Sequence, residues 1–120
     1  MNIPVIAAGG IANGRGMLAA MVLGADGVQI GSRFAASEES SAHTNFKQTI
    51  LDVKDGDTHL TLKELAPVRL VKNKFYEEIQ ELYQKNPTRE ELKDLLGRAR
   101  AKKGIFEGDL VYEELEIGQI

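Results

Sequence analysis

The chain has 120 residues, a length typical of a single domain. Apolar residues make up 42% of it and charged residues 28%, which suits a folded globular protein and argues against a disordered tail. Its 15 basic and 18 acidic residues give a net charge of -3, so no broad positive field can attract nucleic acid or an anionic membrane. We therefore expect neither as a partner.

The sequence contains no cysteine, which excludes disulfides, thiolate metal sites and a cysteine nucleophile. Two histidines are too few for a histidine-rich metal site, so we expect no bound metal. The most apolar stretch, residues 17–23, is much shorter than the roughly 20 residues of a membrane span, and residues 1–4 lack a basic signal-peptide region. These features favour a cytoplasmic protein.

A strand, a helix and a second strand are predicted at the start of the chain. Residues 4–8 form a short apolar run that ends on two glycines, the pattern of a buried parallel strand. Asn13 can cap the helix that follows, and Gly24 suits its end. Residues 27–30 read as the second strand. This βαβ unit requires parallel strands joined by a right-handed crossover.

The spacing of apolar residues predicts a second helix from Ser37 to about Asp52, followed by a turn over residues 54–57. Residues 58–73 have a weaker pattern. A strand over residues 58–62 is one interpretation, and Pro67 excludes a long helix through this stretch.

Two further helices are predicted in the second half. Phe75, Ile79 and Leu82 mark an amphipathic helix that stops before Pro87. Thr88 then opens a capping box for a last helix that should run to Gly104. Residues 105–120 are expected to form a covering tail. We divide the chain into residues 1–53, the βα units, and residues 54–120, a helical and covering segment.

Two glycine loops follow the two predicted parallel strands. In α/β proteins, ligands bind beyond the carboxyl ends of such strands, so both loops should open on one site. Glycine allows the backbone to approach an anion, and free N–H groups point at phosphate oxygens. Arg33 beside the second loop adds positive charge. The alternative is that these glycines only make tight turns.

The other candidate residues show no pattern that indicates a binding or catalytic role. Gly14 and Gly16 lack the third glycine of a dinucleotide fingerprint, because Ala19 stands in its place. His43 is predicted to be a packed or capping residue, and His59 has no partner nearby in sequence. The charged residues from Lys72 to Lys103 indicate solvated helix faces. We therefore identify no catalytic residue.

The segments around the two loops resemble a known family. Residues 3–11 and 23–34 resemble the last two barrel units of the nitronate monooxygenases, formerly called 2-nitropropane dioxygenases. That family includes the flavin-dependent enoyl-acyl-carrier-protein reductases of type II. Residues 38–43, 106–109 and 116–119 are similar to its C-terminal segments.

The resemblance implies an α/β fold, namely the C-terminal portion of a TIM (β/α)8 barrel with its last two βα units plus C-terminal helices. It also implies flavin mononucleotide (FMN) as cofactor. Ser32 stands where threonine is commoner in the family, a change that keeps the hydroxyl. The family's catalytic histidine lies earlier in the barrel, so no residue here corresponds to it. The implied cofactor-binding residues are Ala8, Gly9, Gly10, Gly31 and Ser32.

The implied function is that of an FMN-dependent oxidoreductase acting on a nitronate or an enoyl thioester, with NAD(P)H as a possible second cofactor. Residues 67–69, 72–74 and 97–100 lean slightly toward the enoyl-reductase branch. The implied partner is the missing N-terminal barrel portion or a second copy of the chain. The alternative is a non-catalytic structural or oligomerising fragment of such an enzyme.

Overall fold

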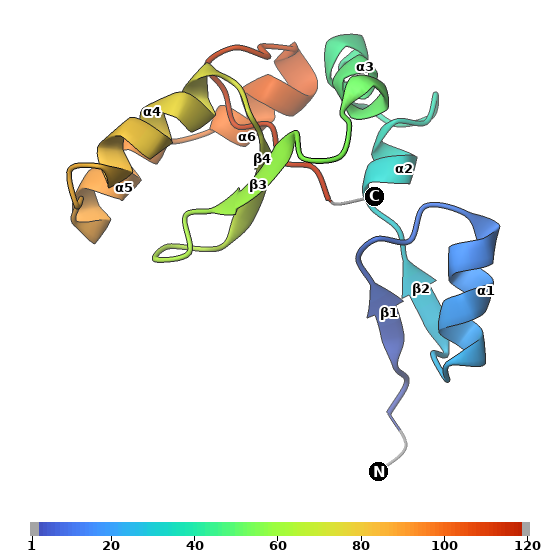
Figure 1. Ribbon diagram of the computed structural model, residues 1–120. Helices are drawn as coiled ribbons and strands as arrows, with labels where there is room; N and C mark the ends of the chain where they lie inside the picture. Colours follow the sequence, from blue (N-terminus) through green and yellow to red (C-terminus); the bar gives the residue numbers. More distant parts are fainter. Residues whose placement is uncertain (1–2, 119–120) are drawn as a thin grey trace.

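The computed structural model describes residues 3–118, and its first half contains the predicted βαβ unit (Figure 1). Strand β1 (Ile6–Ala8) leads into helix α1 (Gly14–Val22) and then strand β2 (Gly27–Gln29). The two strands are parallel, with Ile6 opposite Gly27 and Ala8 opposite Gln29. An α/β fold is therefore confirmed for the described chain.

Local hydrogen bonds explain the ends of α1. The Asn13 side chain caps the helix by accepting a hydrogen bond from the Gly16 N–H, as predicted. Gly24 follows the helix with φ +105°, a conformation that favours glycine. Asp26 then fixes the start of β1, because its carboxylate accepts a 2.8 Å hydrogen bond from the Val5 N–H.

The predicted helix from Ser37 to Asp52 is wrong in its first half. A short helix, α2 (Ser32–Ala35), follows β2 directly, and α3 (Thr44–Asp52) begins only after an irregular segment. The Ser40 hydroxyl accepts a hydrogen bond from the Ala42 N–H within this segment. Serine side chains that bond nearby backbone groups compete with helix formation, which accounts for the break.

A β-hairpin lies within residues 58–73, where the pattern of apolar residues was weak. Strand β3 (Thr58–Thr61) pairs antiparallel with β4 (Val68–Val71). The strand over residues 58–62 and the preceding turn are thus confirmed, and Asp57 closes that turn by accepting a 2.9 Å hydrogen bond from the Lys54 N–H. Strand β4 was not predicted.

Helix α4 (Lys74–Tyr83) is confirmed, and α5 (Arg89–Leu96) begins with the predicted capping box at Thr88. The expected end at Gly104 is wrong. Gly97 and Ala99 both have positive φ, +61° and +66°, so the chain turns away before α6 (Arg100–Lys102) and the π-helix η1 (Lys103–Glu107).

Two hydrophobic clusters lie outside the βαβ unit. The hairpin, α4 and α5 enclose the first cluster: Leu62, Leu70, Phe75, Ile79 and Leu92. The second joins α3 to the tail: Phe46, Ile50, Leu115 and Ile117. The tail therefore packs against α3, and a bridge from Glu116 to Leu70 joins it to β4. The division at residue 53 stays a prediction.

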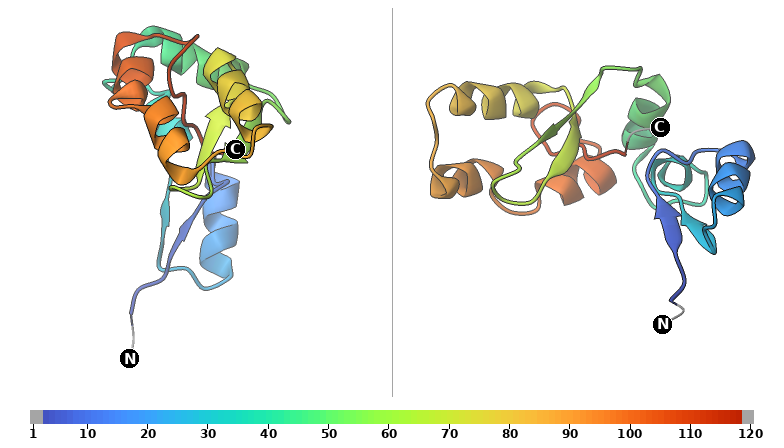
Figure 2. Two further views of the ribbon diagram at one scale, coloured as in Figure 1. Left: turned by 90° about the vertical axis from the view of Figure 1, so that its left-hand side faces the viewer. Right: turned by 60° about the horizontal axis from the view of Figure 1, so that its bottom comes forward.

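The βαβ unit itself projects from the rest of the chain (Figure 2). Helix α1 has no buried residue, and several of its apolar side chains face solvent. Val22 and Leu23 are 77% and 89% exposed. Such an exposed apolar face favours contact with another element, because a helix normally buries its apolar side.

Candidate functional site

A pocket of about 490 Å³ lies at the carboxyl ends of β1 and β2. It brings together all of the residues that the sequence singled out for cofactor binding: Ala8, Gly9, Gly10, Gly31 and Ser32. Their role in binding stays a prediction, but their convergence at one site is a finding.

The first loop has a backbone that glycine alone adopts readily. Gly9 and Gly10 have φ values of +90° and +69°. Within residues 3–118, the N–H groups of Gly10 and Ile11 donate to no backbone or side-chain acceptor. Both residues line the pocket.

The second loop is fixed by the tail of the chain. The Ser32 hydroxyl oxygen accepts a 2.9 Å hydrogen bond from the Gly118 N–H, across 86 positions of sequence. The same hydroxyl donates a weaker hydrogen bond, 3.5 Å long, to the Gly118 carbonyl oxygen. A Cβ added to Gly31 would meet no atom within 4 Å, so there is open space beside this residue.

Sequence reasoning missed much of the pocket wall. Ser40 and Ser41 contribute from the segment that was predicted to be helical. Apolar and tail residues complete the lining: Phe46, Ile50, Ile105, Phe106, Glu116 and Ile117. No local sequence signal connects them with the glycine loops, since the second hydrophobic cluster is what brings α3 and the tail together.

The polar groups of the pocket lining include the backbone of the glycine loops and the hydroxyls of Ser32, Ser40 and Ser41. No basic residue is among the described residues that line it, and Glu116 is its ionisable group. Arg33, which the sequence placed beside the second loop, is exposed and lies outside the lining. Its contribution of positive charge to the site stays a prediction.

The histidines occupy structural positions. His43 caps α3 by accepting a hydrogen bond from the Asn45 N–H, as predicted. His59 packs near the Tyr76 ring, with ring centroids 5.8 Å apart. Over residues 3–118 we find no cluster of three side chains suited to a metal ion.

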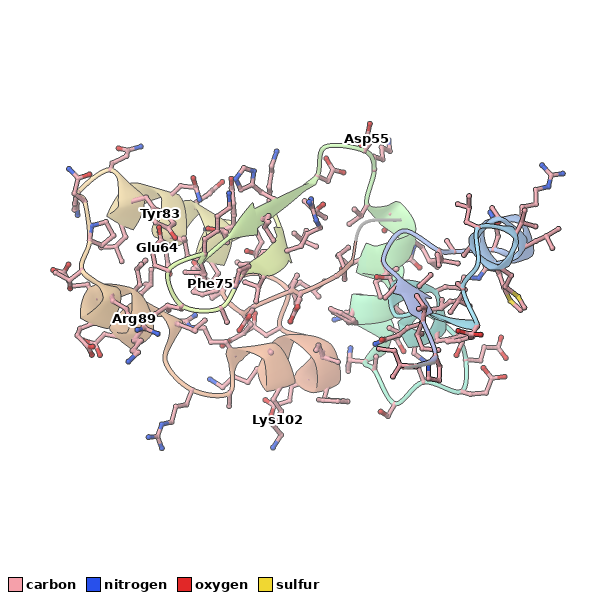
Figure 3. The ribbon with its side chains drawn as sticks, turned by 90° about the horizontal axis from the view of Figure 1, so that it is seen from below. Asp55, Glu64, Phe75, Tyr83, Arg89 and Lys102 are labelled. Atoms are coloured by element: carbon pink, nitrogen blue, oxygen red, sulfur yellow. The ribbon has the colours of Figure 1, made fainter. Side chains whose placement is uncertain are left out.

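Glu39, Glu64 and Glu114 have shifted pKa values, and hydrogen bonds from the backbone and from Ser37 lower that of Glu39. The Tyr83 hydroxyl donates a 2.6 Å hydrogen bond to Glu64, which lowers the Glu64 pKa (Figure 3). Burial, and then this same bond, raise the pKa of Tyr83. Burial also raises the pKa of Glu114, and nearby Glu116 adds to that rise while Arg100 opposes it.

Comparison with known proteins places the chain in a family. The model of the family described as nitronate monooxygenase matches residues 1–113. A probable nitronate monooxygenase of Staphylococcus saprophyticus is 41% identical over 108 residues, which cover 87% of this chain and 30% of that protein. A probable nitronate monooxygenase of Bacillus subtilis is 49% identical over 79 residues, covering 65% of this chain and 23% of the relative.

The solved structure of FabK from Thermotoga maritima superposes on 99% of this chain with a TM-score of 0.87 and 42% identity, covering 38% of that FabK chain. This chain thus spans well under half the length of the relatives it matches. None of the described helices has the length and apolar character needed to cross a membrane. Since the family model covers nearly all of the sequence, the chain belongs to the nitronate monooxygenase family.

Proposed function

We propose that this chain is the FMN phosphate-binding part of an FMN-dependent oxidoreductase of the nitronate monooxygenase family. In this proposal it is the C-terminal portion of a TIM (β/α)8 barrel, comprising the last two βα units and the C-terminal helices. The parallel pairing of β1 with β2 and the greater length of the relatives support this arrangement.

The observation that carries the proposal is the single pocket formed by two loops that follow consecutive parallel strands. In complete barrels, a phosphate site is frequently built from the loops after strands seven and eight. The N–H groups of Gly10 and Ile11, and the Ser32 hydroxyl once it exchanges its long bond to the Gly118 carbonyl, would supply donors suited to a phosphate. Apolar side chains such as Phe46 and Ile50 would cover the less polar part of the ligand.

The residues present therefore fit one end of FMN. Ala8, Gly9, Gly10, Gly31 and Ser32 would hold and orient it. When bound, FMN supplies the electron-transfer chemistry of the reaction. The substrate in this proposal is a nitronate, or an enoyl thioester with NAD(P)H as reductant. The cysteine-free sequence supports a cytoplasmic location.

The test is FMN binding by the purified chain, followed through quenching of FMN fluorescence. Ser32→Ala removes a donor at the loop, and we expect it to weaken binding by about tenfold, corresponding to one hydrogen bond to a charged group. His59→Ala is the control, because His59 is exposed and lies outside the pocket. Binding that is absent in the parent chain, or unchanged by Ser32→Ala, contradicts the phosphate-loop assignment.

A second candidate function is that of a non-catalytic structural or oligomerising fragment. The exposed apolar face of β1 and α1 favours it, with Ile6 and Leu18 at 55% and 63% exposure. In that case the chain should associate without FMN, and its association should not depend on Ser32.

A further inference from the structure

A second, polar pocket adjoins the first across the tail of the chain. It has a volume of about 280 Å³, enough for a phosphate group and several waters at roughly 30 Å³ each. Its lining comes from the turn after α3, the hairpin and the tail: Val53, Lys54, Asp55, Gly56, Thr58, Arg69 and Gly118. Gly118 lines both pockets, so the two sites are neighbours.

Arg69 is the central feature of this second pocket. It is partly buried, and over residues 3–118 no carboxylate lies within 4.0 Å of its guanidinium. One of its nitrogens donates a 3.1 Å hydrogen bond to the Thr58 hydroxyl. A guanidinium carries five N–H donors, so most of its hydrogen-bonding capacity is unused. A partly buried cation that no described carboxylate pairs with favours an anionic ligand.

The surrounding residues supply further donors. Lys54 lines the same pocket and, in the described part of the chain, also has no ion-pair partner. The Thr58 oxygen accepts from Arg69, which leaves its own hydrogen free to be donated. Gly56 has φ +86°, and a Cβ there would meet nothing within 4 Å, so the turn leaves this side of the pocket open.

Two exposed carboxylates oppose this arrangement: Asp55 in the lining, and Asp57, which accepts a hydrogen bond from the Lys54 N–H. Asp55 is part of the lining, but it is exposed, and Figure 3 shows its side chain extending from the outer side of the turn. An exposed carboxylate is well screened by solvent and salt. The lining therefore carries two cationic side chains against one exposed anionic side chain.

We propose that the pocket around Lys54 and Arg69 binds a phosphate group of a second ligand, separate from the one held by the glycine loops. The planar fork of arginine matches the geometry of phosphate oxygens, and lysine adds a point charge. Because Gly118 borders both pockets, the ligand that carries this phosphate lies beside the first site. The site does not require FMN.

The experiment is calorimetric titration of the full chain with inorganic phosphate, repeated with Arg69→Gln and Lys54→Gln. We expect Arg69→Gln to weaken binding by about tenfold, because it removes a charge-assisted hydrogen-bond donor. Lys54 lies on an exposed turn, so Lys54→Gln cannot disturb a core. We expect it to weaken phosphate binding by less than Arg69→Gln does, and this loss separates ligand binding from misfolding. Arg98→Gln is the matched control, since Arg98 is exposed and outside the pocket.

Gly31→Val distinguishes this site from the glycine-loop pocket, because Gly31 lines the first pocket and not the second. It should leave the Arg69-dependent phosphate binding intact, whatever its effect on FMN. If phosphate binding is insensitive to Arg69 and Lys54, or falls equally with Arg98→Gln, the proposal is overturned. Loss of FMN binding alone would overturn only the assignment of the first pocket.

Titration with NADPH and NADH identifies the source of the phosphate. A preference for NADPH that disappears in Arg69→Gln would assign the pocket to a nucleotide 2′-phosphate. Arg69-dependent binding of inorganic phosphate without such a preference would assign it to a phosphate ester of another ligand. Both outcomes support the site.

Discussion

Gly31 and Gly10 line the same pocket, yet a side chain at each position would act differently. Gly31 has φ -97° and open space where a Cβ would lie, so Gly31→Val should fold normally and obstruct only the ligand. Gly10 has φ +69°, so Gly10→Val should lose stability as well as FMN affinity. Thermal unfolding and FMN titration of both variants check this prediction.

His43→Ala provides the matched control for that experiment. Removing the cap of α3 should lower the free energy of unfolding by about 1 kcal/mol, the usual effect of losing a helix cap. The FMN affinity should stay near that of the parent, because His43 does not line the pocket. Equal FMN affinity in Gly31→Val, Gly10→Val and His43→Ala would contradict the assignment of the glycine loops to the FMN site.

Glu114 gives a pH-dependent prediction. Burial and the neighbouring Glu116 raise its pKa, so the folded state holds this proton more tightly than the unfolded state does. Its contribution to stability is therefore present below the ordinary pKa of 4.5 and is lost as the pH rises through the raised value. The change in the free energy of unfolding caused by Glu114→Gln should therefore be more stabilising at pH 7 than at low pH. Chemical denaturation across this range measures the difference; a constant difference would contradict it.

The sequence identified residues whose roles are local. Asn13 and Thr88 were predicted as helix caps because a cap and its N–H partners lie within three positions of each other. Ser40 and Ser41 were not identified as pocket residues, because that requires knowing that α3 packs against the tail. Arg33 is not among the lining residues, since adjacency in sequence does not determine the direction of a side chain.

Helix α4 depends on Phe75, which is fully buried in the first hydrophobic cluster with the Arg100 guanidinium 4.4 Å from its ring centroid. Phe75→Ala should lower the free energy of unfolding by about 3–5 kcal/mol, because it leaves a cavity and removes this cation–π contact. Phe34→Ala is the control: Phe34 is 62% exposed, and its loss should change stability by less than about 0.5 kcal/mol. Similar losses in urea denaturation would contradict this account of the core.

Periodicity predicted elements well where one face is buried. Helix α4 buries Phe75 and Ile79 at helical spacing, and its position was predicted correctly. Strand β4 was missed because only its partner β3 and the tail define it as a strand. The last helix was predicted too long, since Ala99 suits a helix by propensity and yet adopts φ +66° here.

At the scale of the whole molecule, the projecting βαβ unit should cause self-association. Its apolar side chains include Leu18, Val22 and Leu23 at 63%, 77% and 89% exposure, and β1 pairs on one side only among the described strands. Light scattering should give a mass above that of the monomer. Leu18→Glu should reduce the association, whereas a compact monomer that resists dilution would contradict it.

The chain alone should turn over neither a nitronate nor an enoyl thioester, even with excess FMN. The glycine loops can hold one end of the cofactor, but we identify no described residue positioned as an acid or base beside a substrate. Supplying the proposed N-terminal barrel portion as a second chain should restore tight FMN binding and activity. Steady-state assays with free FMN as control measure this, and turnover by the chain alone above that control would contradict it.

The bond between Ser32 and Gly118 also bears on the order of folding. The contacts within the βαβ unit and within the hairpin are local, whereas this bond links positions 86 residues apart. Long loops close slowly, because their ends must meet before any contact compensates for the lost chain entropy. We therefore expect helix signal to appear early in refolding and the completed pocket to appear last, with ligand affinity lagging behind circular dichroism.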